Sequence, residues 1–461
     1  MKQIKKHQQN MLGGPILPSI LAYTIPIILT SLLQLLFNAA DLVVVGQFCG
    51  SISVAAVGAT GALTGLVVNL FIGLSTGAGV TVAHAIGSKE EDVVHRTVHT
   101  ALPTALISGA ILTVVGISFS EAALKLMGTP DNILPLSALY MKIYFGGMTF
   151  NMVYNFCASI LRAAGDTKSP LLFLSISGIV NVILNFIFVS VFHMNVEGVA
   201  LATTISQALS AVLVVITLMR RADACRLILP KIRIYAPQLL KIIRIGLPAG
   251  IQSSLFSISN VMIQSSINSF GDVFMTGNAA AGNIEGFEYV ALNAFGQTAL
   301  NFCGQNIGAR QYKRALKITL TCAACVTGLG ALLSGLIYGF GPGLLSVYIT
   351  DSPQAISYGM IRFVYVSAFC LLCGVMDVFT GSLRGMGASV APMVISTLGI
   401  CGLRIAWVNT AFQIPEFHTP QWLYASYPIS WIVTLAMEAT VFVYVYRQHI
   451  RKDSCQPSPL T

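Results

Sequence analysis

Long apolar runs alternate with short polar connections along almost the whole chain. Each run has about 20 residues or more, which is the length that an α-helix needs to cross the hydrocarbon core of a bilayer. The pattern predicts an all-α polytopic membrane protein and leaves no stretch long enough for a separate soluble domain. Its twelve predicted transmembrane helices are residues 16–45, 54–83, 98–119, 136–160, 170–191, 197–219, 243–269, 278–303, 316–339, 358–383, 391–412 and 424–446.

The composition agrees with this pattern. Of the 461 residues, 55% are hydrophobic and only 9% are charged, whereas a soluble domain has about 25% charged residues. The net charge is +9, which in a soluble protein would raise the question of nucleic acid binding. In this chain the distribution of the basic residues gives a different answer.

Lysine and arginine are concentrated at both termini and in every second connection, as expected for the cytoplasmic ends of membrane helices. The other connections hold few basic residues, mainly Lys125, Lys142 and Arg362. This alternation predicts a multi-pass protein of the cell membrane with both termini in the cytoplasm. Membrane lipids are its expected surroundings, and no nucleic acid partner is expected.

One offset relates the two halves of the chain. The segments "LRAAGDTKSP" (161–170) and "LRGMGASVAP" (383–392) share the pattern L-R-x-x-G-x-x-x-x-P, and every match is displaced by 222 residues. The same displacement holds over about 145 residues. It aligns Pro26 with Pro248, Ser31 with Ser253, Leu33 with Leu255, Asn38 with Asn260 and Phe48 with Phe270.

A constant offset across separate helices indicates an internal duplication. Each repeat contains six spans, so both copies enter the membrane from the same side. We therefore expect two six-helix lobes, related as parallel repeats around a central cavity, which is an arrangement typical of secondary transporters. The predicted N-terminal lobe is 1–222, the predicted cytoplasmic linker is 223–243, and the predicted C-terminal lobe is 244–461.

The first predicted helix carries a polar stripe at Gln34, Asn38 and Asp41, which share one helical face. An interhelical hydrogen-bond seam would explain Gln34 and Asn38. Asp41 differs because it titrates, and a carboxylate within the hydrocarbon costs about 2.5 to 3.5 kcal/mol on insertion scales. It lies about 34 Å along the helix from Pro18, so a hydrated carboxylate near the outer mouth is the alternative to a functional acid.

The second half adds acids and amides inside its apolar windows. Glu285 and Asp377 are candidates to attract organic cations, and Asp377 aligns with Asn155 through the repeat. For Glu288, a salt bridge near a helix end is the alternative. A second stripe follows Asn260 along its helix. The predicted substrate cavity comprises Gln34, Asn38, Asn155, Asn260, Gln264, Asn283, Glu285 and Asp377.

Pro26 and Pro248 lie inside the first predicted helix of each repeat. Proline removes a backbone hydrogen bond and kinks a helix. We predict a gating bend at these positions, with a static kink as the alternative.

With these features together, the sequence resembles the multidrug and toxic compound extrusion (MATE) transporters, and among them the bacterial DinF-like branch. The resemblance covers nearly the whole chain and is carried by "TIPIILTSLLQLLFNAADLVVVGQFCGSISVAAVGA", "ASILRAAGDTKSP", "GSLRGMGASVAP" and "GQNIGARQYKRA". It implies a secondary antiporter that exports amphipathic, especially cationic, organic compounds in exchange for H⁺ or Na⁺. It also implies no cofactor and a functional monomer.

The resemblance further implies a coupling-ion site at Asp41, Asn181, Asn185 and Thr203. Asn181 and Asn185 lie one helical turn apart. Relatives commonly have aspartate where this chain has Asn185, and an amide cannot carry a proton. Two mechanisms remain open: protonation of Asp41, or an all-oxygen Na⁺ site formed by the four residues. The missing second acid favours Na⁺ without deciding the matter.

Two other functions remain as alternatives. A flippase for lipid-linked oligosaccharides would need arginines in its cavity to bind phosphate, and Arg404 is the residue to examine. A membrane-embedded enzyme would need a metal cluster or a nucleophile with its base. His84, His95 and His99 lie close in sequence, but they lack an acid or cysteine that would complete a metal site, so we expect them to face solvent.

Overall fold

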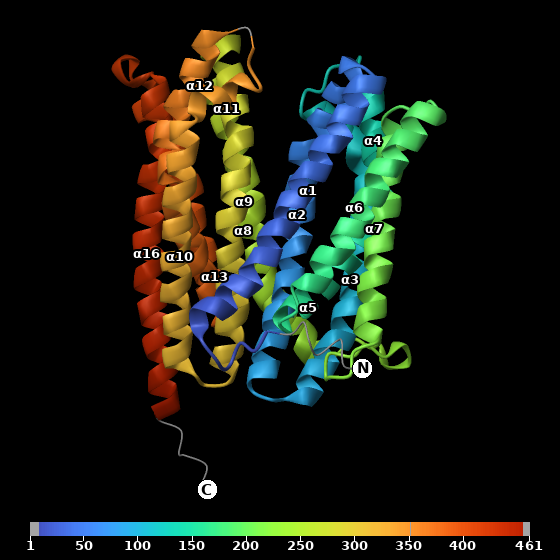
Figure 1. Cartoon of the computed structure of the whole chain (residues 1–461), viewed down its shortest axis with the longest axis vertical. Helices are drawn as coiled ribbons and strands as arrows, with labels where there is room; N and C mark the ends of the chain where they lie inside the picture. Colours follow the sequence, from blue (N-terminus) through green and yellow to red (C-terminus); the bar gives the residue numbers. More distant parts are fainter. Residues whose placement is uncertain (1–8, 351, 455–461) are drawn as a thin grey trace, which may run out of the picture. The chain divides into compact units, whose positions relative to one another are not determined.

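The computed structural model describes residues 9–350 and 352–454, and every regular element in these ranges is helical. The chain forms two compact units. Unit 1 is formed by Ile25–Ser254 with the segment up to Asn10, and unit 2 by Met11–Thr24 with the chain from Leu255 onward. Figure 1 shows each unit as a bundle of long helices.

Unit 1 contains the first half of the elements. They are α1 (Ile16–Phe48) from Ile25 onward, α2 (Ser51–Gly87), α3 (Glu91–Leu126), α4 (Leu134–Gly146), α5 (Met148–Ala163), α6 (Lys168–Phe186), the π-helix η2 (Ile187–Val191), α7 (Val196–Met219), the 3₁₀-helix η3 (Leu229–Lys231), and α8 (Ala236–Asn268) as far as Ser254.

Unit 2 contains the second half. Besides the ends of α1 and α8 it comprises α9 (Asp272–Gly308), α10 (Tyr312–Gly339), α11 (Gly341–Ser346), α12 (Pro353–Tyr365), η4 (Ser367–Phe369), α13 (Cys370–Gly385), α14 (Val390–Ser396), the π-helix η5 (Thr397–Gly402), α15 (Leu403–Asn409), η6 (Ala411–Gln413), η7 (Pro415–Phe417) and α16 (Pro420–Ser454).

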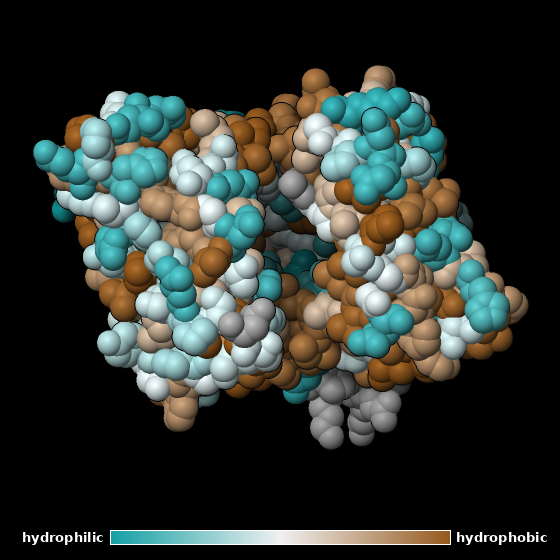
Figure 2. Space-filling view, turned by 90° about the horizontal axis from the view of Figure 1, so that it is seen from above, coloured by the Kyte–Doolittle hydropathy of each residue, from teal (hydrophilic) through white to brown (hydrophobic). Residues whose placement is uncertain are grey.

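The all-α membrane fold predicted from the sequence is confirmed. Within the described ranges, ten helical segments are long and apolar enough to cross a membrane. The two other predicted spans are α4 with α5, which are separated at Gly147, and α9, which is rich in asparagine, glutamine and glutamate. In Figure 2 hydrophilic residues gather on the end face of each unit, and hydrophobic residues appear along its edges.

The shared decapeptide forms the same turn in both repeats. Gly165 and Gly387 end their helices with positive φ angles of 88° and 84°. A side chain is strained in this left-handed conformation, and a helix end of this type therefore favours glycine. Backbone geometry at a helix terminus thus explains the glycine of the shared motif.

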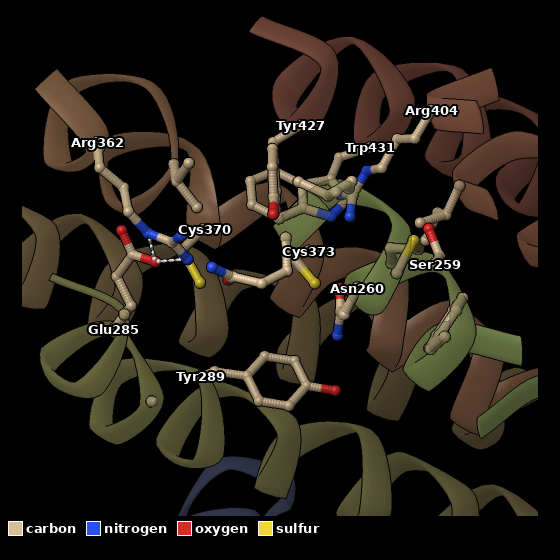
Figure 3. Close-up of a pocket in the computed structure, with 18 of the residues that line it drawn as sticks. Ser259, Asn260, Glu285, Tyr289, Arg362, Cys370, Cys373, Arg404, Tyr427 and Trp431 are labelled. Atoms are coloured by element: carbon tan, nitrogen blue, oxygen red, sulfur yellow. Dashed lines mark hydrogen bonds and ion pairs between the residues drawn. The ribbon is translucent and has the colours of Figure 1, made fainter. Parts of the chain in front are cut away.

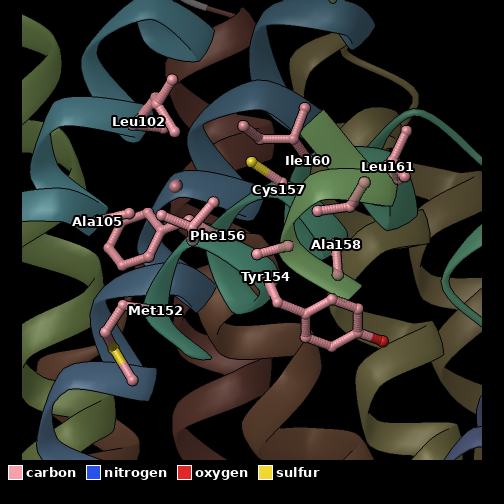
Figure 4. Packing of buried hydrophobic residues seen from close by; sticks show 14 of the residues in the cluster. Leu102, Ala105, Met152, Tyr154, Phe156, Cys157, Ala158, Ile160 and Leu161 are labelled. Carbon is pink, nitrogen blue, oxygen red and sulfur yellow. The ribbon is translucent and has the colours of Figure 1, made fainter. Parts of the chain in front are cut away.

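Helix α5 forms the centre of unit 1, where it packs against α2, α3 and α7. Its residues Met152, Phe156 and Cys157 are fully or almost fully buried, and they belong to the same buried cluster as Leu102 and Ala105 of α3 (Figure 4). The equivalent helix α13 packs against α9, α10 and α16 in unit 2. Each of these central helices is short because it forms only the second part of a predicted span. The first part is α4 before α5 and α12 before α13.

The division between the units falls inside the first helix of each repeat. In α1 it lies between Thr24 and Ile25, beside Pro26, and in α8 it lies a few residues after Pro248. The beginning of α1 is fixed within unit 2, where Thr24 forms a 2.8 Å hydrogen bond with Thr298 and the Tyr23 ring packs edge-on against Phe302.

The beginning of α8 is fixed within unit 1 by close packing against α2. A Cβ atom added at Gly73 would overlap the backbone of Gly250, and one added at Gly77 would overlap the backbone at Ile242. Small residues allow membrane helices to approach in this way.

The connection that follows α7 folds against the cytoplasmic end predicted for α3. The guanidinium of Arg221 is almost fully buried and binds both carboxylate oxygens of Asp223. Burial by itself lowers the pKa of Arg221, but the hydrogen bonds and charge of Asp223 outweigh it and raise the pKa above its ordinary value.

One histidine prediction is wrong. His99 is fully buried, where its Nδ1 atom donates to the carbonyl of His95 and its Nε2 atom accepts from the amide of Ile228 at 3.0 Å. His99 is buried because the connection after α7 covers it and bonds to its ring through Ile228.

The packing of α2 on α8 yields the first prediction. Gly73→Ala should lower the melting temperature of the purified protein, because overpacking a close helix contact costs about 1–3 kcal/mol. Gly58→Ala on the same helix is the control, since its Cβ atom would have no neighbour within 4 Å. Equal melting temperatures of the two variants in the same detergent would contradict the expected effect.

Candidate functional site

Asp41 lies near the end of α1, where it is only 9% exposed. Its two carboxylate oxygens have different partners: Asn185 of α6 donates to Oδ1, and the hydroxyl of Thr203 on α7 donates to Oδ2 at 3.3 Å. The acid therefore joins three helices of unit 1. The close approach of α1 to α6 depends on Gly178, because the ring of Phe37 occupies the place of a side chain there.

Asn181 completes this cluster. Its amide nitrogen donates to Thr203 at 3.4 Å, and its carbonyl oxygen accepts from Asn185 at 3.3 Å. The structure thus brings together all four residues of the coupling-ion site that the resemblance implies. The π-helix η2 begins two residues after Asn185, and such irregular turns are frequent at functional sites.

The cluster offers oxygen atoms to a cation. Asn185 is fully buried, and its carbonyl oxygen has no hydrogen-bond partner among the residues that the structure describes. Together with the carboxylate of Asp41, the hydroxyl of Thr203 and the carbonyl of Asn181, it provides the hard ligands that Na⁺ accepts. The same oxygen could accept a hydrogen bond from a protonated Asp41.

Three of the predicted cavity residues lie elsewhere in unit 1. Gln34 and Asn38 are exposed on α1, and neither belongs to the Asp41 cluster. Asn155 is half-buried on α5, where its amide donates to the backbone and side chain of Asn151. Gln34 and Asn38 lie on the same helix as Asp41, but of these three residues only Asp41 bonds to α6 and α7.

Unit 2 contains a pocket of about 380 Å³. Four of the predicted cavity residues line it, namely Asn260, Gln264, Glu285 and Asp377, whereas Asn283 is exposed and lies outside the lining. Figure 3 shows the pocket, whose other polar and aromatic lining includes Ser259, Tyr289, Arg362, Cys370, Cys373, Arg404, Tyr427 and Trp431.

Glu285 has a charged partner inside this pocket. Its Oε2 atom accepts from Nε and Nη2 of Arg362 at 2.9 and 2.7 Å (Figure 3). Asn278 accepts a further hydrogen bond from Arg362. The arginine was assigned to a connection from the sequence, but it lies in α12, inside the protein, because the buried carboxylate of Glu285 stabilises it there.

The salt-bridge alternative considered for Glu288 fits Glu285 instead. The carboxylate of Glu288 accepts hydrogen bonds from the hydroxyls of Ser334 and Ser367. Asp377 accepts from the amide of Asn293 on α9 at 2.8 Å. Of the acids that line the pocket, Asp377 is therefore the one that forms no ion pair in the described structure.

Unit 2 contains two further buried charges, of which the sequence analysis singled out only Arg404. Glu438 of α16 is fully buried and accepts from Thr380 at 2.9 Å and from Ser396 at 2.8 Å. Arg404 of α15 is 4% exposed and lines the pocket. A single charged residue inside an apolar window was the available signal for both.

Comparison with known proteins gives the family. A family model described as MatE matches residues 26–187 and 248–408. The two matches begin 222 residues apart and so reproduce the offset of the internal repeat. The chain belongs to the MatE family. It is therefore a MATE family membrane transporter.

Individual relatives cover most of this MATE chain. It is 26% identical over 440 residues to "Probable multidrug resistance protein YoeA" of Bacillus subtilis, with 93% of each chain covered. It is 27% identical to "Probable multidrug resistance protein YpnP" of the same organism, over 85% of this chain and 87% of the relative. The structure titled "Crystal structure of MATE in the bent conformation" shares the fold with a TM-score of 0.86 at 18% identity, covering 95% of this chain and 98% of that chain.

The buried ion pair gives the second prediction. Arg362→Gln or Glu285→Gln should destabilise the protein by about 3–5 kcal/mol, because each change leaves an unpaired buried charge. The double variant should be more stable than either single variant. The measurement is the free energy of unfolding in a double-mutant cycle.

The exposed pair Asp92 and Arg96 is the control, since surface pairs contribute about 0–1 kcal/mol. Additive effects at Glu285 and Arg362 would show that the two charges do not stabilise each other.

Proposed function

We propose that this MATE transporter is an antiporter that exports amphipathic organic compounds, including positively charged ones, in exchange for H⁺ or Na⁺. The observation that carries the proposal is the buried carboxylate of Asp41, held by amides and a hydroxyl from two other helices. The names of the relatives as multidrug resistance proteins support an organic cargo. The expected location is the cell membrane, with both termini in the cytoplasm and a monomer as the working unit.

Cation binding at Asp41 would change the hydrogen bonds of the cluster. The charged carboxylate accepts from Asn185 and Thr203. A protonated carboxyl must donate one hydrogen bond, and the unpartnered carbonyl oxygen of Asn185 is the nearby acceptor. A bound Na⁺ would instead turn the carbonyl and hydroxyl oxygens toward itself. Either event neutralises the acid and rearranges the contacts of α1 with α6 and α7.

Helix α1 links this rearrangement to the rest of the protein. Asp41 fixes its later part within unit 1, and Thr24 fixes its beginning within unit 2. Pro26 lies between these two attachments and weakens the helix where it must bend. The predicted gating role of Pro26, and of Pro248 in α8, remains part of this proposal.

The ion gradient would supply the free energy. Exchange of one proton for one monovalent cation is driven by about 1.4 kcal/mol per pH unit. Entry of a second ion would let the membrane potential add about 2.3 kcal/mol per 100 mV.

One observation favours a flippase as a second candidate. Arg404 lies in the pocket of unit 2, where a phosphate-bearing lipid would require a cation. A flippase for such cargo differs from an antiporter because its cargo is a lipid and because its turnover need not depend on an inward ion gradient.

Transport by Asp41→Asn tests the proposed antiport. Uptake of a fluorescent organic cation into everted vesicles should follow an imposed proton or sodium gradient, each tested alone. The initial uptake rate of the variant should be about tenfold lower than that of the native protein, because an amide neither takes up a proton nor neutralises a cation. The response to the two gradients identifies the coupling ion.

Asp131→Asn is the matched control, since Asp131 is exposed in the connection between α3 and α4. Transport that ignores both gradients would overturn the antiport. Undiminished transport by Asp41→Asn would overturn the role of this acid.

A further inference from the structure

Arg404 is a buried cation that lacks a charged partner. Its Nε atom donates to the hydroxyl of Ser430 at 2.9 Å. Its Nη2 atom is buried without a hydrogen-bond partner, and no acid of the described structure forms an ion pair with it. Leaving a charged donor unpartnered inside a protein is costly. A pocket that includes this donor is therefore incomplete without an acceptor.

The aromatic wall beside Arg404 is already occupied by positive charge. The guanidinium carbon lies 4.0 Å from the ring centre of Tyr427 and 5.5 Å from that of Trp431. Arg362 lies 6.0 Å from the ring of Tyr427 as well. An organic cation would have to displace these arginines from the aromatic faces, and it would also meet their charge.

Neither acid that lines the pocket forms an ion pair with Arg404 in the described structure. Glu285 is bound by Arg362, and Asp377 is held toward α9 by Asn293. In Figure 3 Tyr289 of α9 lies on the other side of the pocket from Tyr427 and Arg404. The pocket therefore has an unpaired positive charge on α15, beside the aromatic rings of α16, while Asp377 is held toward α9.

We propose that this pocket binds cargo that carries an anionic group next to an aromatic ring, with the anion on Arg404. The inference rests on the proposed transport function and changes one part of it, since this pocket would favour anionic or zwitterionic cargo over the simple cations expected from the sequence. A guanidinium forms strong hydrogen bonds with a carboxylate or phosphate, and the cavity of about 380 Å³ is of ordinary size for a small organic ligand. A positive group elsewhere on the same cargo faces Asp377, so zwitterions fit as well as anions.

Calorimetric titration of the purified full-length protein in detergent tests the proposal, with empty micelles as the blank. The probes are 1-naphthoate, 1-naphthyl phosphate, the neutral 1-naphthalenemethanol and 1-naphthylmethylammonium. We expect naphthoate to bind at least tenfold more tightly than the neutral alcohol and the ammonium compound. A preference for naphthyl phosphate over naphthoate would assign the site to phosphate-bearing cargo, and the reverse order would assign it to carboxylates.

Three variants locate the anion. Arg404→Gln should remove the preference for naphthoate over the alcohol while leaving the alcohol bound, which shows that the pocket is intact. Arg404→Lys should keep part of the preference, because it retains the charge without the planar donor pair. Arg226→Gln changes an exposed arginine of the connection after α7 and should behave as the native protein.

Equal binding of naphthoate and the alcohol by the native protein would overturn the proposal. An unchanged preference in Arg404→Gln would do so too. If that variant does not fold, Arg404→Lys provides the test. A preference for naphthoate that falls by less than threefold in Arg404→Lys would overturn the assignment of the anion to Arg404. These titrations need no ion gradient, so they are independent of the transport test. Anion binding without gradient-driven transport would overturn only the antiport. Gradient-driven transport without anion binding would overturn only the anion site.

Discussion

A hydrocarbon environment offers no hydrogen bonds, so each polar group inside a membrane helix must be satisfied by the protein itself. The interior charges of this transporter meet that constraint in different ways. Asp41 is surrounded by neutral amide and hydroxyl groups, and Glu285 is bound by an arginine. Arg404 has an aromatic face and one hydroxyl. The group that satisfies each charge determines what it can still bind.

Neutral partners leave Asp41 free to gain a positive charge, whereas the partner of Glu285 is a permanent cation. An acid in an ion pair is a poor site for a coupling ion, because the incoming cation must first displace the arginine. Arg404 is the opposite case, since its remaining donor needs an acceptor. The two units therefore differ in chemistry although they share a duplicated scaffold. The repeat offset places Ile263 opposite Asp41 and Val182 opposite Arg404, so each of these charges is present in one copy only.

The sequence predicted the features that depend on local periodicity and on the repeat. The spans follow from apolar windows, and the turn at Gly165 and Gly387 recurs because both helices end in the same left-handed conformation. The grouping of Asn181, Asn185 and Thr203 with Asp41 was implied by the family resemblance. Spacing along one helix could not have shown which neighbouring helix the acid faces.

The missed features depend on partners that are distant in the chain. Arg362 and Glu285 are 77 residues apart, and hydropathy alone placed the arginine at a helix end. The burial of His99 depends on a backbone amide that comes 129 residues later. Gln34 and Asn38 share a stripe with Asp41, yet their side chains are exposed while that acid is buried. Periodicity identifies a polar face, but tertiary packing determines which of its members meet a partner.

The division of α1 at Thr24 bears on how such a molecule could have arisen. The segment Met11–Thr24 belongs to the second compact unit, and the beginning of α8 belongs to the first. A polypeptide of half this length would therefore lack a stretch of helix that its own bundle requires. Before the gene duplicated, two copies would have had to exchange these stretches, and fusion would have made that pairing permanent.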